Sequence, residues 1–297
     1  MKDWRPQTWA VRAQAEESTH HEHSVPMFLT SSFVFEDSEE MRAAFAGEID
    51  RNIYARFTNP NVEELSEKVR RLEGAEAGHS MATGMAAVFA TFGALLSSGD
   101  HILACRSLFG STHTILTTIL PRFGITHTYV DAADPDSWPG EIRENTRMIF
   151  VETPTNPAVD LVDLKWLGKL AAEKGVILVV DNCFATPILQ RPIEFGAHLS
   201  LHSATKYIDG QGRVMGGVVV GGKDLVQEIY DFARATGPSL SPFNAWVLSK
   251  SVETLEVRMK KHSENALVAA RWLEGRTGVA SVRYPFLPSH PQYKIAK

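Results

Sequence analysis

Four short segments of this chain place polar or small residues next to an apolar run. They are Ala82–Ala87, Glu152–Pro157, Asp181–Asn182 and His202–Lys206. In an open α/β sheet, ligands bind at the carboxyl ends of the strands, so polar residues that directly follow a strand are candidates for chemistry. Each segment alone is weak evidence, because such short strings also arise by chance. All four on strand ends of one predicted sheet indicate a single binding site.

The residue types in these segments match the requirements of pyridoxal phosphate (PLP). Lys206 can form an imine with an aldehyde, and Asp181 can keep a pyridine nitrogen protonated, so that the ring withdraws electrons. The small residues around Gly84, ahead of an apolar helix, leave backbone N–H groups open for a phosphate. The competing interpretation makes Asp181 an ordinary buried acid in a salt bridge and Lys206 an exposed helix lysine.

The elements that must position these residues alternate between strand and helix. The continuous apolar run Val176–Val180 is typical of a strand covered on both faces. The repeated β-then-α order predicts an α/β fold with a mainly parallel sheet sandwiched by helices. The other strands are expected at His101–Ala104, Thr126–Val130, Arg147–Val151, His198–His202 and Val214–Val220, with helices at Met85–Leu96, Thr112–Leu120 and Leu164–Lys174.

Residues that start and stop helices frame the N-terminal part. Asp37 and Glu40 resemble a capping pair ahead of a short helix, Asn59–Pro60 opens a longer one, and Gly74 ends it. We expect an N-terminal arm over residues 1–48 and a large cofactor-binding domain over residues 49–245.

The last part of the chain changes character. Pro242–Glu274 is one long, charged, amphipathic stretch that is broken by Gly275, and Val279–Val282 is expected to start a strand. We therefore expect residues 246–297 to begin a smaller α+β domain.

Composition narrows the class of protein. Over 297 residues the net charge is −5, which offers no basic field for nucleic acid. The first thirty residues lack the apolar core of a signal peptide, and no run approaches the ~20 apolar residues of a membrane span. We expect a cytoplasmic protein with Cys105 and Cys183 as buried free thiols. His20, His21 and His23 lack the spacing of metal ligands, so no metal site is expected.

With these motifs in place, the sequence resembles the Cys/Met-metabolism family of fold-type-I PLP enzymes from Ser24 to Lys297. This is the transsulfuration group of cystathionine synthases and lyases, homoserine-ester sulfhydrylases and methionine γ-lyase. The resemblance implies that Lys206 binds the cofactor covalently and later moves protons between the Cα and Cγ sides of the substrate. It also implies that Asp181 pairs with the pyridine nitrogen and that Asn156 lies near the ring oxygen.

The resemblance further implies how the phosphate is held. The donors are backbone N–H groups and hydroxyls, from Gly84 and Met85 and from Ser203 and Thr205. Tyr54 and Arg56, in Tyr-Ala-Arg-Phe-Thr-Asn-Pro, match a pair that reaches the phosphate of a neighbouring subunit. An active unit of at least a dimer follows, and the family is typically homotetrameric.

Three strings narrow the resemblance to the O-succinylhomoserine sulfhydrylases: Tyr207–Gly217, Thr236–Trp246 and Tyr284–Pro291. Phe109 stands where most members place a tyrosine over the cofactor ring; it can stack but has no hydroxyl to move a proton. Ser111 stands where methionine γ-lyases carry a cysteine. The implied reaction is γ-replacement, in which O-succinylhomoserine and sulfide give homocysteine and succinate.

Several alternatives stay open from the sequence. Phe109 could be a simple core aromatic residue, and the activity could be cystathionine γ-synthesis or a β- or γ-lyase reaction. The chain is shorter than is usual in the family, and the arginine that binds the substrate α-carboxylate is expected in a part it lacks. A PLP-binding but idle protein is therefore a third interpretation. No residue fixes the acyl group as succinyl, acetyl or phosphoryl.

Overall fold

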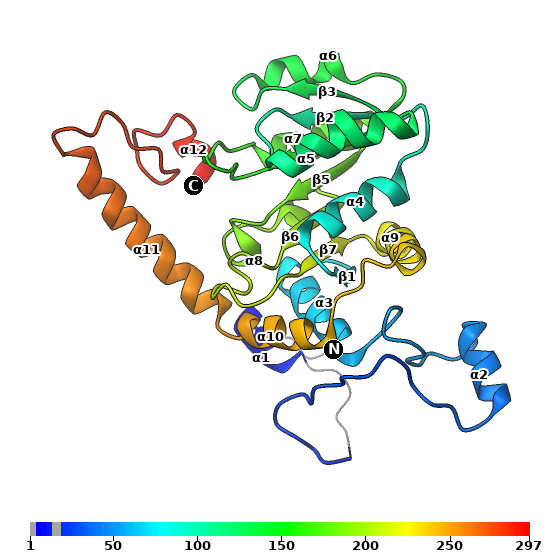
Figure 1. The fold of residues 1–297 in the computed structure, drawn as a ribbon. Helices are drawn as coiled ribbons and strands as arrows, with labels where there is room; N and C mark the ends of the chain where they lie inside the picture. Colours follow the sequence, from blue (N-terminus) through cyan, green and yellow to red (C-terminus); the bar gives the residue numbers. More distant parts are fainter. Residues whose placement is uncertain (1–3, 14–18) are drawn as a thin grey trace.

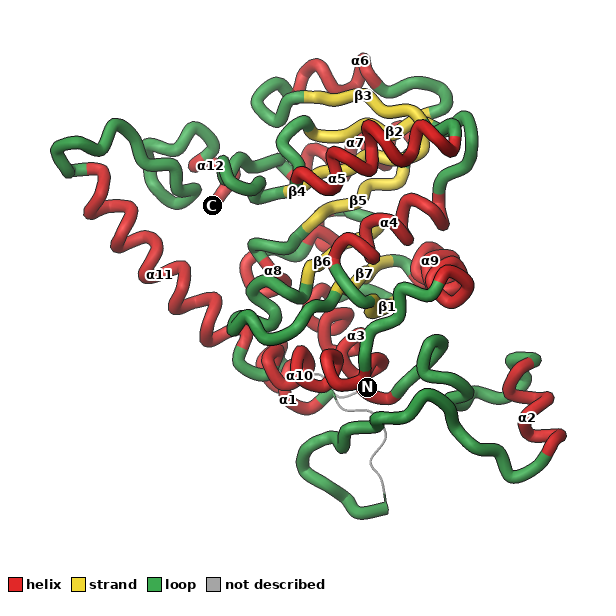
Figure 2. Tube along the Cα trace, in the orientation of Figure 1, coloured by secondary structure: helices red, strands yellow, loops and turns green. Residues whose placement is uncertain are grey.

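The computed structural model describes residues 4–13 and 19–297, and its centre is a seven-stranded sheet between two layers of helices (Figures 1 and 2). The sheet confirms the α/β fold class. Its strands are β1 (Ala77–Met81), β2 (His101–Cys105), β3 (Thr126–Val130), β4 (Thr146–Glu152), β5 (Ile177–Asp181), β6 (Leu199–Ser203) and β7 (Gly217–Gly221).

Twelve α-helices occur in the described part of the chain. They are α1 (Pro6–Arg12), α2 (Ser38–Phe45), α3 (Pro60–Glu73), α4 (Gly84–Leu95), α5 (Gly110–Thr114), α6 (Trp138–Glu141), α7 (Leu164–Lys174), α8 (Thr186–Leu189), α9 (Lys223–Thr236), α10 (Pro242–Val252), α11 (Leu255–Glu274) and α12 (Tyr293–Ala296). The helix expected over Thr112–Leu120 is one helical run that changes type, from α5 through a π-helical turn at Ile115–Ile119 to a 3-10 turn at Leu120–Phe123.

The strand order is β1-β7-β6-β5-β4-β2-β3. Strand β7 runs antiparallel to both of its neighbours, and every other pairing in this sheet is parallel. The expectation of a mainly parallel sheet is therefore confirmed. Strand β1 and helix α9 were not expected from the sequence, and β1 joins the sheet only through β7.

Three apolar clusters cover the two faces of the sheet. Helices α4 and α9 cover one face, where Phe92 of α4 meets Phe150 of β4 edge to face at 5.2 Å between ring centroids. Helix α7 covers the other face around β4 and β5, and α3 and α10 cover it around β7. Residues such as Phe92 and Leu248 are fully buried. Burying both faces explains why the central strands are continuous apolar runs.

The expected helix boundaries in the N-terminal part are confirmed. The Asn59 side chain accepts a hydrogen bond from the Asn61 backbone N at 3.0 Å, and α3 ends at Gly74 in the left-handed region with φ 74°. Asp37 accepts from the Glu40 backbone N at 2.8 Å and so caps α2. Each interaction satisfies a backbone group that a helix end leaves without an intrahelical partner.

The prediction for the C-terminal part was wrong in one respect. The amphipathic stretch Pro242–Glu274 is helical and consists of α10 and α11, with a turn at Glu253–Thr254 between them. The expected strand at Val279–Val282 does not form. In residues 246–297 there is no strand at all, since this segment has no neighbouring strand to complete a ladder. The expected division at residues 245/246 falls within α10, and the domain boundaries stay a prediction.

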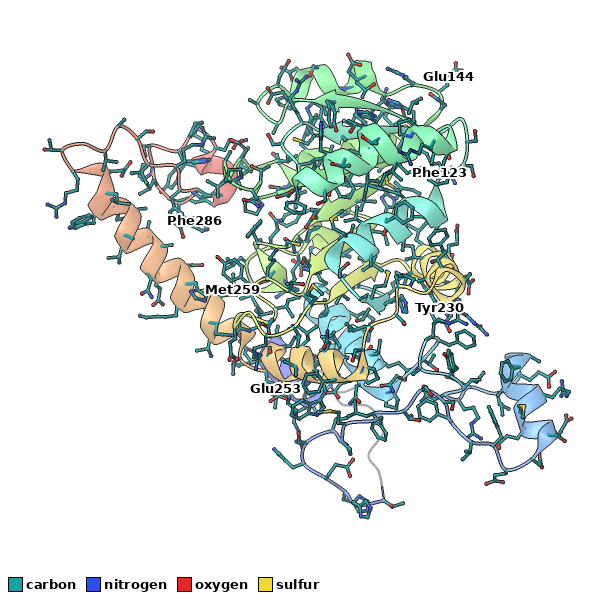
Figure 3. All side chains as sticks on the ribbon, viewed as in Figure 1. Phe123, Glu144, Tyr230, Glu253, Met259 and Phe286 are labelled. Carbon is teal, nitrogen blue, oxygen red and sulfur yellow. The ribbon has the colours of Figure 1, made fainter. Side chains whose placement is uncertain are left out.

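Helix α11 leads away from the sheet, and the following segment returns toward the loop after β4 (Figure 1). Gln292 anchors this return by accepting from the Leu161 backbone N at 2.7 Å. A groove of about 570 Å³ lies along α11 and the returning segment, and Met259 and Phe286 both line it (Figure 3). Among the described residues, no helix is long and apolar enough to cross a membrane.

Candidate active site

The carboxyl ends of β4, β5 and β6 lie side by side. Glu152 at the end of β4 is in register with Asp181 at the end of β5, and Asp181 is in register with Leu201 of β6. Parallel pairing brings the residues that follow each strand to the same edge of the sheet. The segments expected from the sequence to form one site therefore meet there.

Lys206 lies in the turn that follows β6, and its side chain is exposed. It is not part of a helix, so the interpretation of Lys206 as a helix lysine was wrong. Burial raises the pKa of the Asp181 carboxyl, and the nearby Lys206 ammonium is among the groups that oppose this rise. The lysine and the acid that the sequence predicts for the site are therefore electrostatically coupled.

Asp181 is 9% exposed, and burial raises the pKa of its carboxyl. Hydrogen bonds from Cys183 oppose that rise, one from its thiol and one from its backbone N at 3.1 Å. In the part of the chain that the structure describes, no salt bridge includes Asp181, which contradicts the salt-bridge interpretation. A buried acid of this kind favours a proton or a cationic partner, as a protonated pyridine would provide.

Cys183 links the acid to the segment after β6. Its Sγ accepts a hydrogen bond from the Ser203 backbone N at 2.8 Å, and the side chain is half-buried rather than fully buried as expected. Burial raises the pKa of the Cys183 thiol well above its usual value, and the negative charge of Asp181 adds to this effect. The thiol therefore stays protonated and serves as a hydrogen-bond bridge.

The start of α4 faces the end of β6. Thr83 caps the helix by accepting from the Ala86 backbone N at 3.0 Å. The N–H groups of Gly84 and Met85, in the first turn, have no partner within the helix. A helix N-terminus with open N–H groups favours an anion, so this end of α4 suits a phosphate.

Glycines allow the backbones to meet at this point. A Cβ atom on Gly84 would lie 2.5 Å from the Ser203 Cβ, and one on Gly217 would lie 2.0 Å from the Thr83 carbonyl oxygen. Thr205 joins the same cluster, because its Oγ1 accepts from the Gly216 backbone N at 3.2 Å. The four residues predicted to hold the phosphate thus come from α4, from the end of β6 and from the turn after it.

Phe109 and Asn156 approach the same edge from two loops. The Phe109 side chain is 40% exposed at the start of α5, so the interpretation as a core aromatic residue was wrong. Both backbone N–H groups donate to Glu152, that of Phe109 to Oε2 at 2.7 Å and that of Asn156 to Oε1 at 2.9 Å. The Phe109 ring is therefore free to cover a ligand.

The structure does not bring Tyr54 and Arg56 to this edge. Tyr54 lies next to the N-terminal arm, where it bridges to Ser32. The Arg56 guanidinium packs over the Phe57 ring at 4.8 Å and donates to the Arg234 carbonyl at the end of α9. Their predicted role toward a neighbouring subunit stays a prediction.

A polar network supports the site from the opposite face of the sheet. Glu73, fully buried at the end of α3, uses Oε1 to accept from Asn182 Nδ2 at 3.0 Å and from Ser200 Oγ at 2.8 Å. The same oxygen lies 2.7 Å from His202 Nε2. Since Asn182 follows Asp181 and His202 precedes Ser203, this network holds the backbones that carry two predicted site residues.

Sequence reasoning did not assign a role to Glu152, Cys183 or Glu73. Glu152, like Asp181, is an acid at the end of a buried strand, and this pattern could have identified it. Many polar residues follow Glu152 in the same turn, so the pattern did not single it out. Cys183 carries no spacing signal. Glu73 could not be found, because its partners lie far away in the sequence.

Comparisons with known proteins identify relatives of this chain in sequence and in fold. An O-succinylhomoserine sulfhydrylase of Pseudomonas aeruginosa is 48% identical over 290 residues, which cover 98% of this chain and 72% of that protein. An L-methionine gamma-lyase of Porphyromonas gingivalis is 40% identical over 293 residues, covering 98% and 73%. A Campylobacter jejuni structure assigned as an O-acetylhomoserine (thiol)-lyase, with pyridoxyl-lysine monophosphate, has a TM-score of 0.95 at 30% identity and covers 99% of this chain and 81% of that one.

The fold and these likenesses define a PLP-dependent enzyme of fold type I. More particularly, the model of the Cys/Met metabolism PLP-dependent enzyme family matches residues 7–297, and the chain belongs to that family.

The residues of this chain fit the cofactor of that family. The phosphate would lie against the open N–H groups of α4 and the hydroxyls beside them. The backbone is so close to Ser203 at this point that a side chain at position 84 would not fit. The ring nitrogen would meet Asp181, whose burial calls for a cationic partner. Lys206 lies one turn beyond β6, within electrostatic reach of that acid.

Replacing Gly84 with alanine should weaken PLP binding. The new Cβ would overlap Ser203 and force apart two sets of phosphate donors. We expect the dissociation constant to rise about tenfold or more, the equivalent of one lost hydrogen bond, measured by absorbance titration. Gly140→Ala is the control, since a Cβ at Gly140 meets nothing within 4 Å. Equal affinity in the two variants would contradict the proposed cradle.

Stability should depend on the ionisation of Glu152. Burial, and then the charge of Asp181, raise the pKa of Glu152 from 4.5 to about 7. Between these values the folded chain keeps a proton that the unfolded chain has released, so stability falls as pH rises through this window. Glu152→Gln should reduce the pH dependence of the free energy of unfolding by up to roughly 3 kcal/mol across this window. The measurement is denaturant unfolding at several pH values. Parallel curves for the parent and the variant would show that Glu152 does not titrate in this range.

Proposed function

We propose that this chain catalyses γ-replacement, converting O-succinylhomoserine and sulfide to homocysteine and succinate. The observation that supports PLP chemistry is the convergence of the ends of β4, β5 and β6, with Lys206 in the turn after β6 and the Gly84–Ser203 contact beside it. The identity of 48% to a sulfhydrylase, against 40% to a methionine gamma-lyase, favours replacement over elimination. Ser111, in place of the cysteine expected in methionine γ-lyases, points the same way.

Bound PLP would supply an electron sink for negative charge that develops at the substrate carbon next to the amino group. The Lys206 amine would remove the proton from Cα and return protons on the Cγ side of the substrate. Asp181 would hold the ring nitrogen in its protonated form. The N–H groups of Gly84 and Met85 and the hydroxyls of Ser203 and Thr205 would orient the phosphate.

Phe109 and Asn156 complete the proposed set of contacts. The exposed Phe109 ring would stack on the cofactor ring, and Asn156 would lie near the ring oxygen. Phe109 has no hydroxyl, so it cannot carry a proton, and proton transfer falls to Lys206. Over the whole reaction the Cγ–O bond breaks and its electron pair leaves with succinate as a carboxylate, while a C–S bond from hydrosulfide forms and the hydrosulfide proton stays on the thiol of homocysteine.

The activity is tested with the purified chain, PLP, O-succinylhomoserine and sulfide. Homocysteine should form and should depend on sulfide, and Lys206→Ala should lower the rate by at least about 10³-fold, because it removes the group that transfers protons. Cystathionine formed from cysteine would instead identify a γ-synthase, and 2-oxobutyrate formed without sulfide would identify a lyase. PLP absorbance without any product would leave a cofactor-binding protein.

We further propose a cytoplasmic homotetramer built from dimers that share active sites. The support is the position of Tyr54 and Arg56, which lie with the arm and α9 rather than at the Gly84–Ser203 contact of their own chain. In such a dimer each of the two residues would reach the phosphate of its partner.

Mixing two inactive variants should therefore restore activity. A dimer of one Arg56→Ala chain and one Lys206→Ala chain would contain one complete site, made of Lys206 from the first chain and Arg56 from the second. Random pairing predicts about a quarter of the parental activity, measured after joint refolding. Each variant refolded alone is the control, and a mixture no more active than either would show that Arg56 serves its own chain.

A further inference from the structure

Glu152 is a buried acid for which the proposed reaction has no direct use. It is 3% exposed, and both carboxylate oxygens accept from backbone N–H groups, one in the loop after β2 and one in the loop that Glu152 itself begins. Oε2 accepts from Phe109, which follows β2, and Oε1 accepts from Asn156, which follows β4. One carboxylate therefore ties together two loops that come from neighbouring strands.

The side chains carried by these loops have little packing to hold them. Phe109 is 40% exposed, and Asn156 is also exposed. Exposed side chains are placed mainly by their backbone, so the two hydrogen bonds to Glu152 fix where the ring and the amide can lie. The register of β4 with β5 places Glu152 next to Asp181. The two hydrogen bonds therefore fix the positions of both loops relative to Asp181.

We propose that Glu152 is a positioning residue that sets Phe109 and Asn156 at a fixed place relative to Asp181. The role of those two side chains toward the cofactor rests on the proposed function. The positioning itself concerns only contacts within this chain, so it can be tested separately.

The chemistry of the carboxylate explains why another residue would not serve. A glutamine offers one acceptor oxygen and an NH₂ group, so one of the two backbone N–H groups would face a donor. An aspartate keeps the charge but is one methylene shorter, and it cannot reach both loops from the end of β4. Above about pH 7, where Glu152 is ionised, Glu152→Gln removes the charge and one bond, whereas Glu152→Asp removes the reach alone.

The decisive experiment is amide hydrogen exchange on the full chain, with and without PLP. In Glu152→Gln and in Glu152→Asp, the amides of Phe109 and Asn156 should exchange at least about tenfold faster than in the parent. Glu64→Gln is the control for general destabilisation: Glu64 is 2% exposed, accepts from Ser249 on α10 at 2.9 Å and pairs with the buried Lys68 at 2.8 Å. Unchanged exchange at both amides in Glu152→Gln, or a parental pattern in Glu152→Asp, would overturn the inference.

A second readout separates positioning from general destabilisation. In PLP-loaded Glu152→Gln, the visible circular dichroism of the cofactor should weaken while PLP affinity stays within about threefold, since the phosphate donors and Lys206 are intact. The kcat for homocysteine formation should fall about tenfold to hundredfold with little change in KM, as expected for a misplaced contact. Parental dichroism together with a parental kcat would also overturn the inference. A parent chain that makes no homocysteine, yet shows the exchange pattern, would reject the proposed function alone.

Discussion

One oxygen atom of Glu73 holds the ends of two central strands in place. Asn182 and Ser200 donate to it, and His202 lies beside it, all in a part of the protein that water does not reach. A buried carboxylate is costly unless several donors surround it, so the arrangement is stable only when α3, β5 and β6 are in register together. Asp181, which precedes Asn182, and Ser203, which follows His202, are the last residues of β5 and β6 and lie directly beside these anchored residues.

The site itself concentrates acidic groups where the surroundings disfavour negative charge. Asp181 and Glu152 are buried side by side, the pKa of each is raised, and Cys183 stays protonated between the acid and Ser203. A cationic partner beside these two carboxyl groups would stabilise the folded chain. The helix N-terminus at Gly84 adds positive potential for an anion a short distance away. The chain thus offers complementary places for the two charged ends of a cofactor before any ligand enters.

Local patterns predicted the central architecture well. Val176–Val180 was typical of a strand covered on both faces, and Asn59–Pro60 with Gly74 marked both ends of α3. Strand β1 was missed because Ala-Gly-His-Ser-Met has low β propensity, and it is a strand only because β7 pairs with it. The strand expected at Val279–Val282 does not form for the opposite reason: its residues have suitable β propensity, but no neighbouring strand pairs with them.

The residues of the candidate site also fall into those that local patterns predict and those that depend on distant contacts. Lys206, Asp181, Gly84 and Ser203 were predicted because each stands at a strand end or helix start, which is a local property. The contacts of Glu152 and Glu73 depend on pairings across the sheet, and no short string reports them. Tyr54 and Arg56 lie beside the N-terminal arm and α9, and their proposed role toward a second chain stays a prediction.

The antiparallel strand β7 has a consequence for synthesis of the protein. Strand β1, ending at Met81, pairs with β7, which begins at Gly217, and Gly217 also packs against the backbone at Thr83. A nascent chain emerging from the ribosome therefore carries the first half of the phosphate cradle long before its counterpart exists. Strands β2 to β6 can assemble as they emerge, but β1 waits with its edge unpaired. The β1–β7 pairing and the packing of Gly217 against Thr83 can therefore form only after β7 has been synthesised.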